Sequence, residues 1–77
     1  MGRMSGQGRR SLRVWRAEKD ATQLQIARLA GMNHTRYWQI ENAEGHAPTK
    51  DEKAAVAAAL GVKVAAVAWP EFAVKAS

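Results

Sequence analysis

Four side chains that follow a helix-capping asparagine are the candidate functional group of this 77-residue chain. They stand at i, i+1, i+4 and i+5, the spacing of one helix face: His34, Thr35, Trp38 and Gln39. Hydroxyl, amide and imidazole groups on such a face can bond to the edges of base pairs in a DNA major groove. The alternative is a polar helix face that meets only solvent.

Catalysis has no comparable group of residues. The chain contains no cysteine, two histidines and seven acidic residues. A helix and a loop separate His34 from His46, so the sequence shows neither metal-ligand spacing nor a nucleophile–base pair. We therefore expect no enzyme activity, no metal site and no cofactor.

Two short helices that meet at a turn would position this polar face, over residues 22–42. Thr22 with Gln25 three residues later has the spacing of a capping box, which predicts the start of the first helix. Gly31 suits a left-handed turn, and Asn33 suits the N-cap of the second helix. Two helices joined by a short turn that contains glycine form a helix-turn-helix motif.

The rest of the chain predicts further helices and no strand. Residues 11–19 form a first helix, and Thr49 with Glu52 marks the start of another that ends at Gly61. Residues 62–69 have room for one more. The fold class is therefore all-α, a compact bundle of four to five short helices. The expected core comprises Leu12, Trp15, Leu24, Ile26, Tyr37, Ile40, Val56, Leu60 and Val67.

Basic residues outnumber acidic ones, twelve to seven, and give a net charge of +5. Such an excess favours a polyanionic partner. Residues 1–10 have no apolar periodicity and predict a flexible basic N-terminal arm, which either reaches DNA or is a frayed tail. Residues 11–69 are the expected domain, and residues 70–77 a short C-terminal tail.

The longest apolar run, over residues 62–69, is too short to cross a membrane. No charged-then-apolar signal segment opens the chain. The sequence therefore predicts a cytoplasmic, nucleoid-associated protein with no membrane partner.

These residues together resemble the xenobiotic-response-element (XRE) family of helix-turn-helix domains, which includes the Cro-like repressors of phages. The resemblance covers about residues 12–67 and rests on short motifs in order: LRVWR, TQ, AGMN, YWQIEN, APT and AALGV. It implies a lambda-repressor-like fold whose third helix, residues 34–42, lies in the major groove. The implied function is a sequence-specific transcriptional repressor that binds double-stranded DNA, as a homodimer on a palindromic operator.

The resemblance also assigns roles to single residues. Gln23 matches a glutamine that contacts a DNA phosphate, and Arg16 with Glu41 matches a structural ion pair between the first and third helices. Base and nearby phosphate contacts fall to Asn33, His34, Thr35 and Gln39. The expected DNA-binding set is completed by Arg36, which serves phosphate or solvent, by Trp38, and by Asn42 at the end of the helix.

Several residues depart from the family pattern. Ala43 replaces the usual glycine, so we expect the exit from the third helix to be built differently. Glu44 stands where a basic residue is usual. Trp38 is large for a groove-facing position, and it has three readings: a contact in the groove, an anchor for a protein partner, or a side chain folded back on the second helix.

Two interfaces follow as expectations. Residues 62–69, with Val64, Val67 and Trp69, are the expected contact between two protomers. The alternative function is a protein-interaction module, or an antitoxin of the same fold, that acts mainly through a protein partner.

Overall fold

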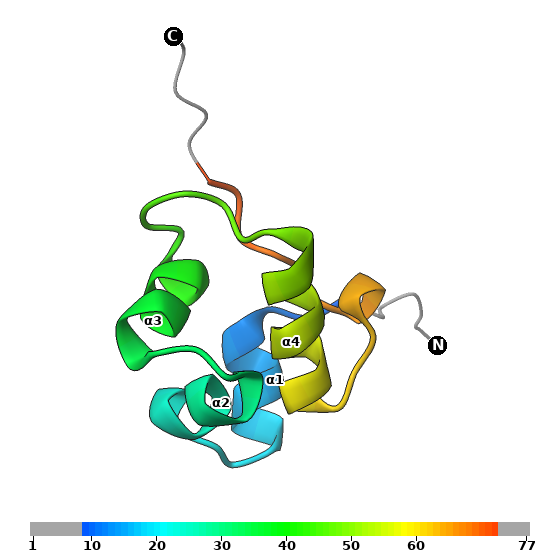
Figure 1. The fold of residues 1–77 in the computed structure, drawn as a ribbon. Coiled ribbons are helices and arrows are strands. Elements are labelled where there is room, and N and C mark those ends of the chain that lie inside the picture. Colours follow the sequence, from blue (N-terminus) through cyan, green and yellow to red (C-terminus); the bar gives the residue numbers. More distant parts are fainter. Residues whose placement is uncertain (1–8, 73–77) are drawn as a thin grey trace, which may run out of the picture.

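The computed structural model describes residues 9–72 of the chain. Its elements are α1 (Leu12–Glu18), α2 (Gln23–Ala30), α3 (His34–Asn42), α4 (Lys50–Leu60) and the short 3₁₀ helix η1 (Val64–Ala66). Figure 1 shows α2 packed beside α4, with α3 set at an angle to both. The described residues form no strand beyond one isolated bridge between Arg10 and Val67. The predicted all-α bundle is confirmed.

The helix starts lie where the capping residues predict them. Thr22 and Gln25 form a complete capping box, with N–H···O distances of 3.1 and 2.8 Å between side chains and backbone. Thr49 and Glu52 repeat it at the start of α4. Asn33 caps α3 by accepting a backbone hydrogen bond. These caps satisfy backbone N–H groups that have no partner within the helix.

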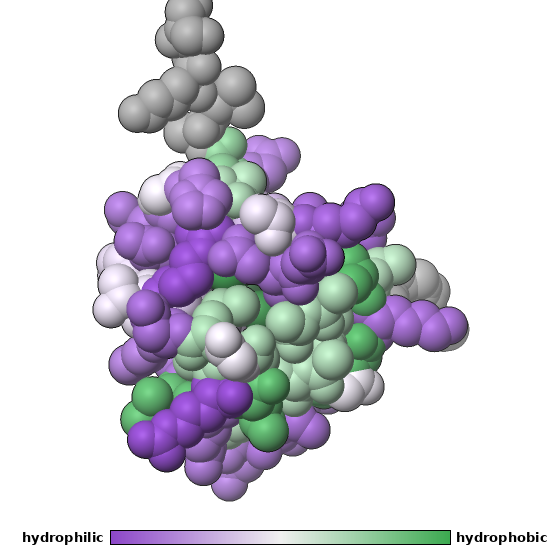
Figure 2. All heavy atoms as spheres, viewed as in Figure 1, coloured by the Kyte–Doolittle hydropathy of each residue, from purple (hydrophilic) through white to green (hydrophobic). Residues whose placement is uncertain are grey.

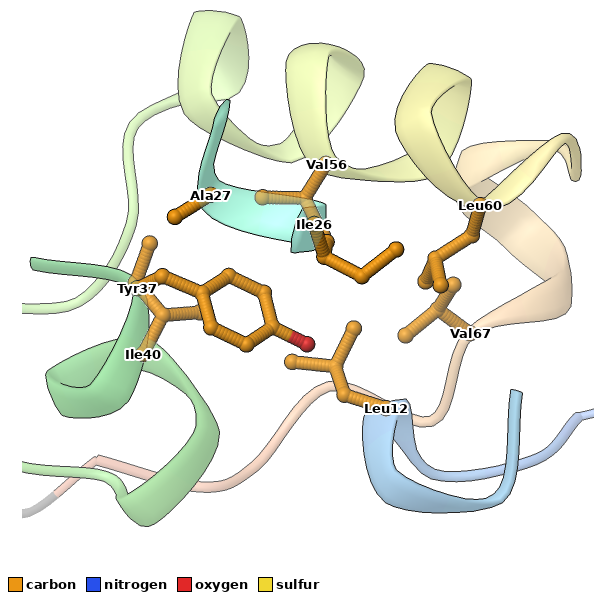
Figure 3. Packing of buried hydrophobic residues seen from close by; sticks show 8 residues of the cluster. All are labelled: Leu12, Ile26, Ala27, Tyr37, Ile40, Val56, Leu60 and Val67. Atoms are coloured by element: carbon orange, nitrogen blue, oxygen red, sulfur yellow. The ribbon is translucent and has the colours of Figure 1, made fainter. Parts of the chain in front are cut away.

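The core lies between all four helices and the chain after η1, as Figure 3 shows. Its buried members are Leu12, Ile26, Ala27, Tyr37, Ile40, Val56, Leu60 and Val67. The prediction for Leu24 is wrong, because this side chain is 42% exposed. The inward face of α2 runs through Ile26 and Ala27, and Leu24 lies off it. Trp15 is half-buried, and its indole N–H donates to the Ala66 carbonyl at 2.9 Å.

Ala43 ends α3 in a left-handed conformation, with φ 58° and ψ 41°. Its N–H and that of Glu44 both donate to the Gln39 carbonyl. The expectation of a different exit is therefore wrong, because alanine adopts the backbone that favours glycine. A left-handed alanine costs about 1 kcal/mol.

The start of the described chain pairs with the segment that contains the end of η1. The Arg10 N–H donates to the Ala66 carbonyl at 3.1 Å, and the Arg10 carbonyl accepts from Ala68 N–H at 2.8 Å. The Arg10 guanidinium lies 5.2 Å from the centre of the Trp15 ring and pairs with Glu18. Arg10 is thus tied to the domain, which differs from the expected arm; residues 1–8 of that arm lie outside the described residues.

Within residues 62–69, only Val64–Ala66 are helical, and they form a single 3₁₀ turn. Val67, expected at a contact between protomers, is only 2% exposed and belongs to the core. That expectation is therefore wrong for Val67. The Trp69 indole N–H donates to the Val64 carbonyl at 3.1 Å, so Trp69 is held against its own chain.

The surface differs in character between helices. Figure 2 shows pale hydrophobic surface over α4, where five alanines follow Lys53, and mostly hydrophilic surface over α3. Within residues 9–72, no helix has the length and apolarity needed to cross a membrane. The same residues contain no cluster of three or more side chains suited to a metal ion.

Candidate nucleic-acid interface

The Glu41 carboxylate on α3 is the centre of a buried network behind the polar face. Its side chain is 1% exposed. It accepts two hydrogen bonds from the Arg16 guanidinium, at 3.0 and 3.1 Å. The Tyr37 hydroxyl donates to it at 2.8 Å and the Gln23 amide at 2.7 Å. Three helices therefore meet at one carboxylate.

The protonation states in this network follow from its geometry. Burial alone would raise the pKa of Glu41, but hydrogen bonds from Arg16, Gln23 and Tyr37 outweigh it and hold the pKa below its ordinary value. The hydrogen bond to Glu41 raises the pKa of Arg16. Burial and then the bond to Glu41 raise the pKa of the Tyr37 hydroxyl. Glu41 is thus held in its charged form, and it accepts hydrogen bonds from Arg16, Gln23 and Tyr37.

Four of the expected site residues gather at the start of α3. The Oε1 atom of Gln23 lies 3.2 Å from Nε2 of His34. Gln23 and His34 line one hollow together with Thr35 and Trp38. His34, Thr35 and Trp38 are exposed, and Trp38 exposes 43% of its surface. The structure therefore brings together a donor–acceptor pair, a hydroxyl and an indole.

The remaining expected residues on α3 have other surroundings. The Asn33 Oδ1 atom accepts the backbone N–H of Arg36 at 2.8 Å as a cap. Gln39 is half-buried beside Gly45. A Cβ atom added to Gly45 would lie 3.5 Å from the Oε1 atom of Gln39. Asn42 donates to the Trp38 carbonyl at 2.9 Å. Gln39 and Asn42 thus lie nearer the far end of α3.

The environment of Arg36 differs from the expected cation facing phosphate or solvent. Its guanidinium donates to both oxygens of Glu52, at 2.9 and 2.7 Å, and to the His46 carbonyl at 3.2 Å. The side chain is only 13% exposed. The hydrogen bonds from Arg36 lower the pKa of Glu52 to about 2, and the pKa of Arg36 is raised in turn. Arg36 joins α3 to α4.

The sequence interpretation missed Arg13 as a candidate contact. This side chain is 65% exposed, and its guanidinium donates to Oδ1 of Asn42 at 2.9 Å. It therefore places a positive charge beside the end of α3. The spacing contained a signal, since Arg13 precedes Arg16 by three residues and shares its helix face.

The left-handed turn at Gly31 between α2 and α3, together with the exposed polar side chains of α3, defines a helix-turn-helix domain. A family model described as a helix-turn-helix domain matches residues 9–69. The chain belongs to this family, which is part of the XRE and Cro-like group. Membership indicates a DNA-binding regulator. A search of curated proteins found no significant match.

Proposed function

We propose that this protein is a sequence-specific transcriptional repressor that reads the major groove with residues 34–42. The observation that carries the proposal is the group of exposed His34, Thr35 and Trp38 on α3 beside the half-buried Gln23 of α2. Recognition helices of this motif contact base edges with their N-terminal residues. The buried Glu41 network behind this group supports the proposal, because side chains that contact DNA bases must be held in place by a rigid framework.

Each side chain has a role suited to its chemistry. The Gln23 amide nitrogen carries two hydrogens and Glu41 takes one, which leaves one for a phosphate. Thr35 and His34 face bases, and the Trp38 ring suits a thymine methyl or a sugar. Asn33, Gln39 and Asn42 supply further contacts along α3, and Arg13 supplies a phosphate contact. We assign Arg36 to the scaffold.

We further propose that the repressor binds as a homodimer on a palindromic operator, with half-sites roughly 34–36 Å apart. The core supports this, because its buried side chains are few and small domains gain stability by association. The exposed part of residues 62–69 is the proposed contact. It includes Val64, which is 39% exposed.

Selection of bound sequences from random DNA tests the function. The proposal predicts an enriched consensus with two-fold symmetry, whose half-sites are about one helical turn apart. Binding should fall steeply as salt rises, because released counterions contribute to affinity. Absence of any enriched sequence would contradict sequence-specific binding.

A second candidate function is a protein-interaction module, and the exposed Leu24 and Trp38 favour it. They expose 42% and 43% of their surfaces, and both lie beside the Gln23–His34 pair. Exposed tryptophan is a frequent anchor of protein interfaces. Enrichment of a consensus by the isolated chain would favour the repressor, whereas binding to a protein partner that blocks DNA would favour the module.

A further inference from the structure

The Gln23 side chain can take only one orientation between its two neighbours. Glu41 is a buried, charged carboxylate, so it accepts hydrogen bonds and cannot donate them. The Gln23 amide nitrogen must therefore face Glu41, and the 2.7 Å contact is between these groups. The amide oxygen is left to face His34, 3.2 Å from Nε2.

This orientation determines which ring nitrogen of His34 carries the proton. An amide oxygen can only accept, so Nε2 of His34 must be the donor. In the neutral ring, the other nitrogen, Nδ1, then has no proton and is an acceptor. Within residues 9–72, Nδ1 has no hydrogen-bond partner, and His34 is exposed at the first position of α3.

We propose that Gln23, held by Glu41, fixes the proton of His34 on Nε2 and so makes His34 a specificity residue for an exocyclic amino group. In the major groove, such donors are presented by adenine at N6 and by cytosine at N4. Guanine and thymine present acceptors at the equivalent position. The inference rests on the proposed DNA-binding function for its base preference, while the tautomer is a property of the free protein.

Protonation of the ring reverses the preference. A second proton on Nδ1 turns the acceptor into a donor, which suits guanine O6 or N7, thymine O4 or a phosphate. The charged side chains that line the hollow beside His34 are Arg16 of α1 and Asp20 of the following turn. Glu41 lies behind Gln23, and Thr35 and Trp38 on the other side are uncharged.

Nitrogen NMR of the free protein tests the first step. In the neutral ring, we expect Nε2 of His34 to be the protonated nitrogen, with a hydrogen-bonded ring proton. In Gln23→Leu, the Nε2 proton of His34 should exchange with water, so that its signal disappears. The nitrogen chemical shifts of Nδ1 and Nε2 should also move closer together. Thr35→Val is the matched control and should leave them unchanged, and His46→Asn assigns the signals. A proton on Nδ1, or shifts that Gln23→Leu leaves unchanged, would overturn the inference.

Selection from random DNA at about pH 8 and about pH 5 tests the second step, after NMR titration has shown His34 neutral in one sample and charged in the other. One consensus position should prefer adenine or cytosine at the higher pH and lose that preference at the lower pH. His34→Gln should remove the pH difference. An enriched consensus with no such position overturns this inference alone, whereas no enrichment at either pH contradicts the repressor function and leaves the tautomer result standing.

Discussion

Arg36 of α3 and Glu52 of α4 form a two-point ion pair, with N···O distances of 2.9 and 2.7 Å. The same carboxylate also accepts the backbone N–H of Thr49 at 3.0 Å, where α4 begins. The Glu52 side chain thus completes a helix cap and holds α3 against α4. Arg36 therefore joins α3 to α4, which supports its proposed assignment to the scaffold.

Acid should weaken the domain through Glu52. Because the Arg36 hydrogen bonds hold its pKa at about 2 in the folded protein, against an ordinary 4.5, the unfolded chain takes up the proton first. The stabilisation is therefore complete above about pH 4.5 and is lost as the pH falls towards 2. After allowance for solvent screening, we expect a loss of about 1–2 kcal/mol in the free energy of unfolding.

Glu52→Gln is the matched variant for this measurement. Glutamine keeps an oxygen for the Thr49 cap and removes the charge. Urea unfolding between about pH 5.5 and pH 2.5 should show a smaller pH slope for the variant than for the parent chain. Equal slopes would show that Glu52 does not contribute to acid sensitivity.

Removal of Arg16 should be strongly destabilising, because it leaves the buried Glu41 charge without its main partner. We expect Arg16→Met to lower the free energy of unfolding by about 3 kcal/mol. Arg13→Met is the control, since the Arg13 guanidinium is exposed and 3.6 Å from Glu41. It should cost less than about 1 kcal/mol. Similar losses in both variants would contradict the central position of the Arg16–Glu41 pair.

The left-handed Ala43 offers a stabilising substitution. Ala43→Gly should raise the free energy of unfolding by about 0.5–1 kcal/mol, because glycine adopts φ 58° without steric cost. Ala54→Gly, at an exposed position inside α4, should lower it by about 1 kcal/mol. Thermal unfolding measures both. A loss of stability in Ala43→Gly would show that the alanine carries no strain.

Base readout and phosphate contact should respond differently to substitution. Thr35→Ala should weaken binding to the selected operator and relax the preference at one base pair by about 1–3 kcal/mol. Arg13→Ala should weaken binding to all sequences alike and reduce the salt dependence by about one ion. Titrations of operator and altered operators at several salt concentrations separate the two. If Thr35→Ala weakened all sequences equally, its assignment to bases would be wrong.

Much of the fold could be predicted because its signals are local. The caps at Thr22, Asn33 and Thr49 depend on a side chain and a backbone group three residues apart, so the spacing carries the information. The prediction for Leu24 is wrong because it rests on the apolar type of the side chain alone. Helical spacing places the inward face of α2 along Ile26 and Ala27, and Leu24 lies off that face.

The candidate site was predictable in part for the same reason. The polar face at His34 and Thr35 follows from helical spacing, and the family resemblance suggested a pairing of Arg16 with Glu41. The position of Arg36 was not accessible, because its partner Glu52 lies in another helix beyond a loop. The Gln23–His34 contact likewise spans the turn, and only the fold brings these side chains together.

Equilibrium binding of the selected operator, in competition with scrambled DNA of equal length at fixed salt, tests whether α3 reads the DNA sequence. We expect the parent chain to prefer the operator by about 10³-fold or more. The double variant His34→Ala with Thr35→Ala should lose most of that ratio and keep its affinity for scrambled DNA. Equal affinity of the parent chain for both DNAs, or an unchanged ratio in the double variant, would contradict sequence reading by α3.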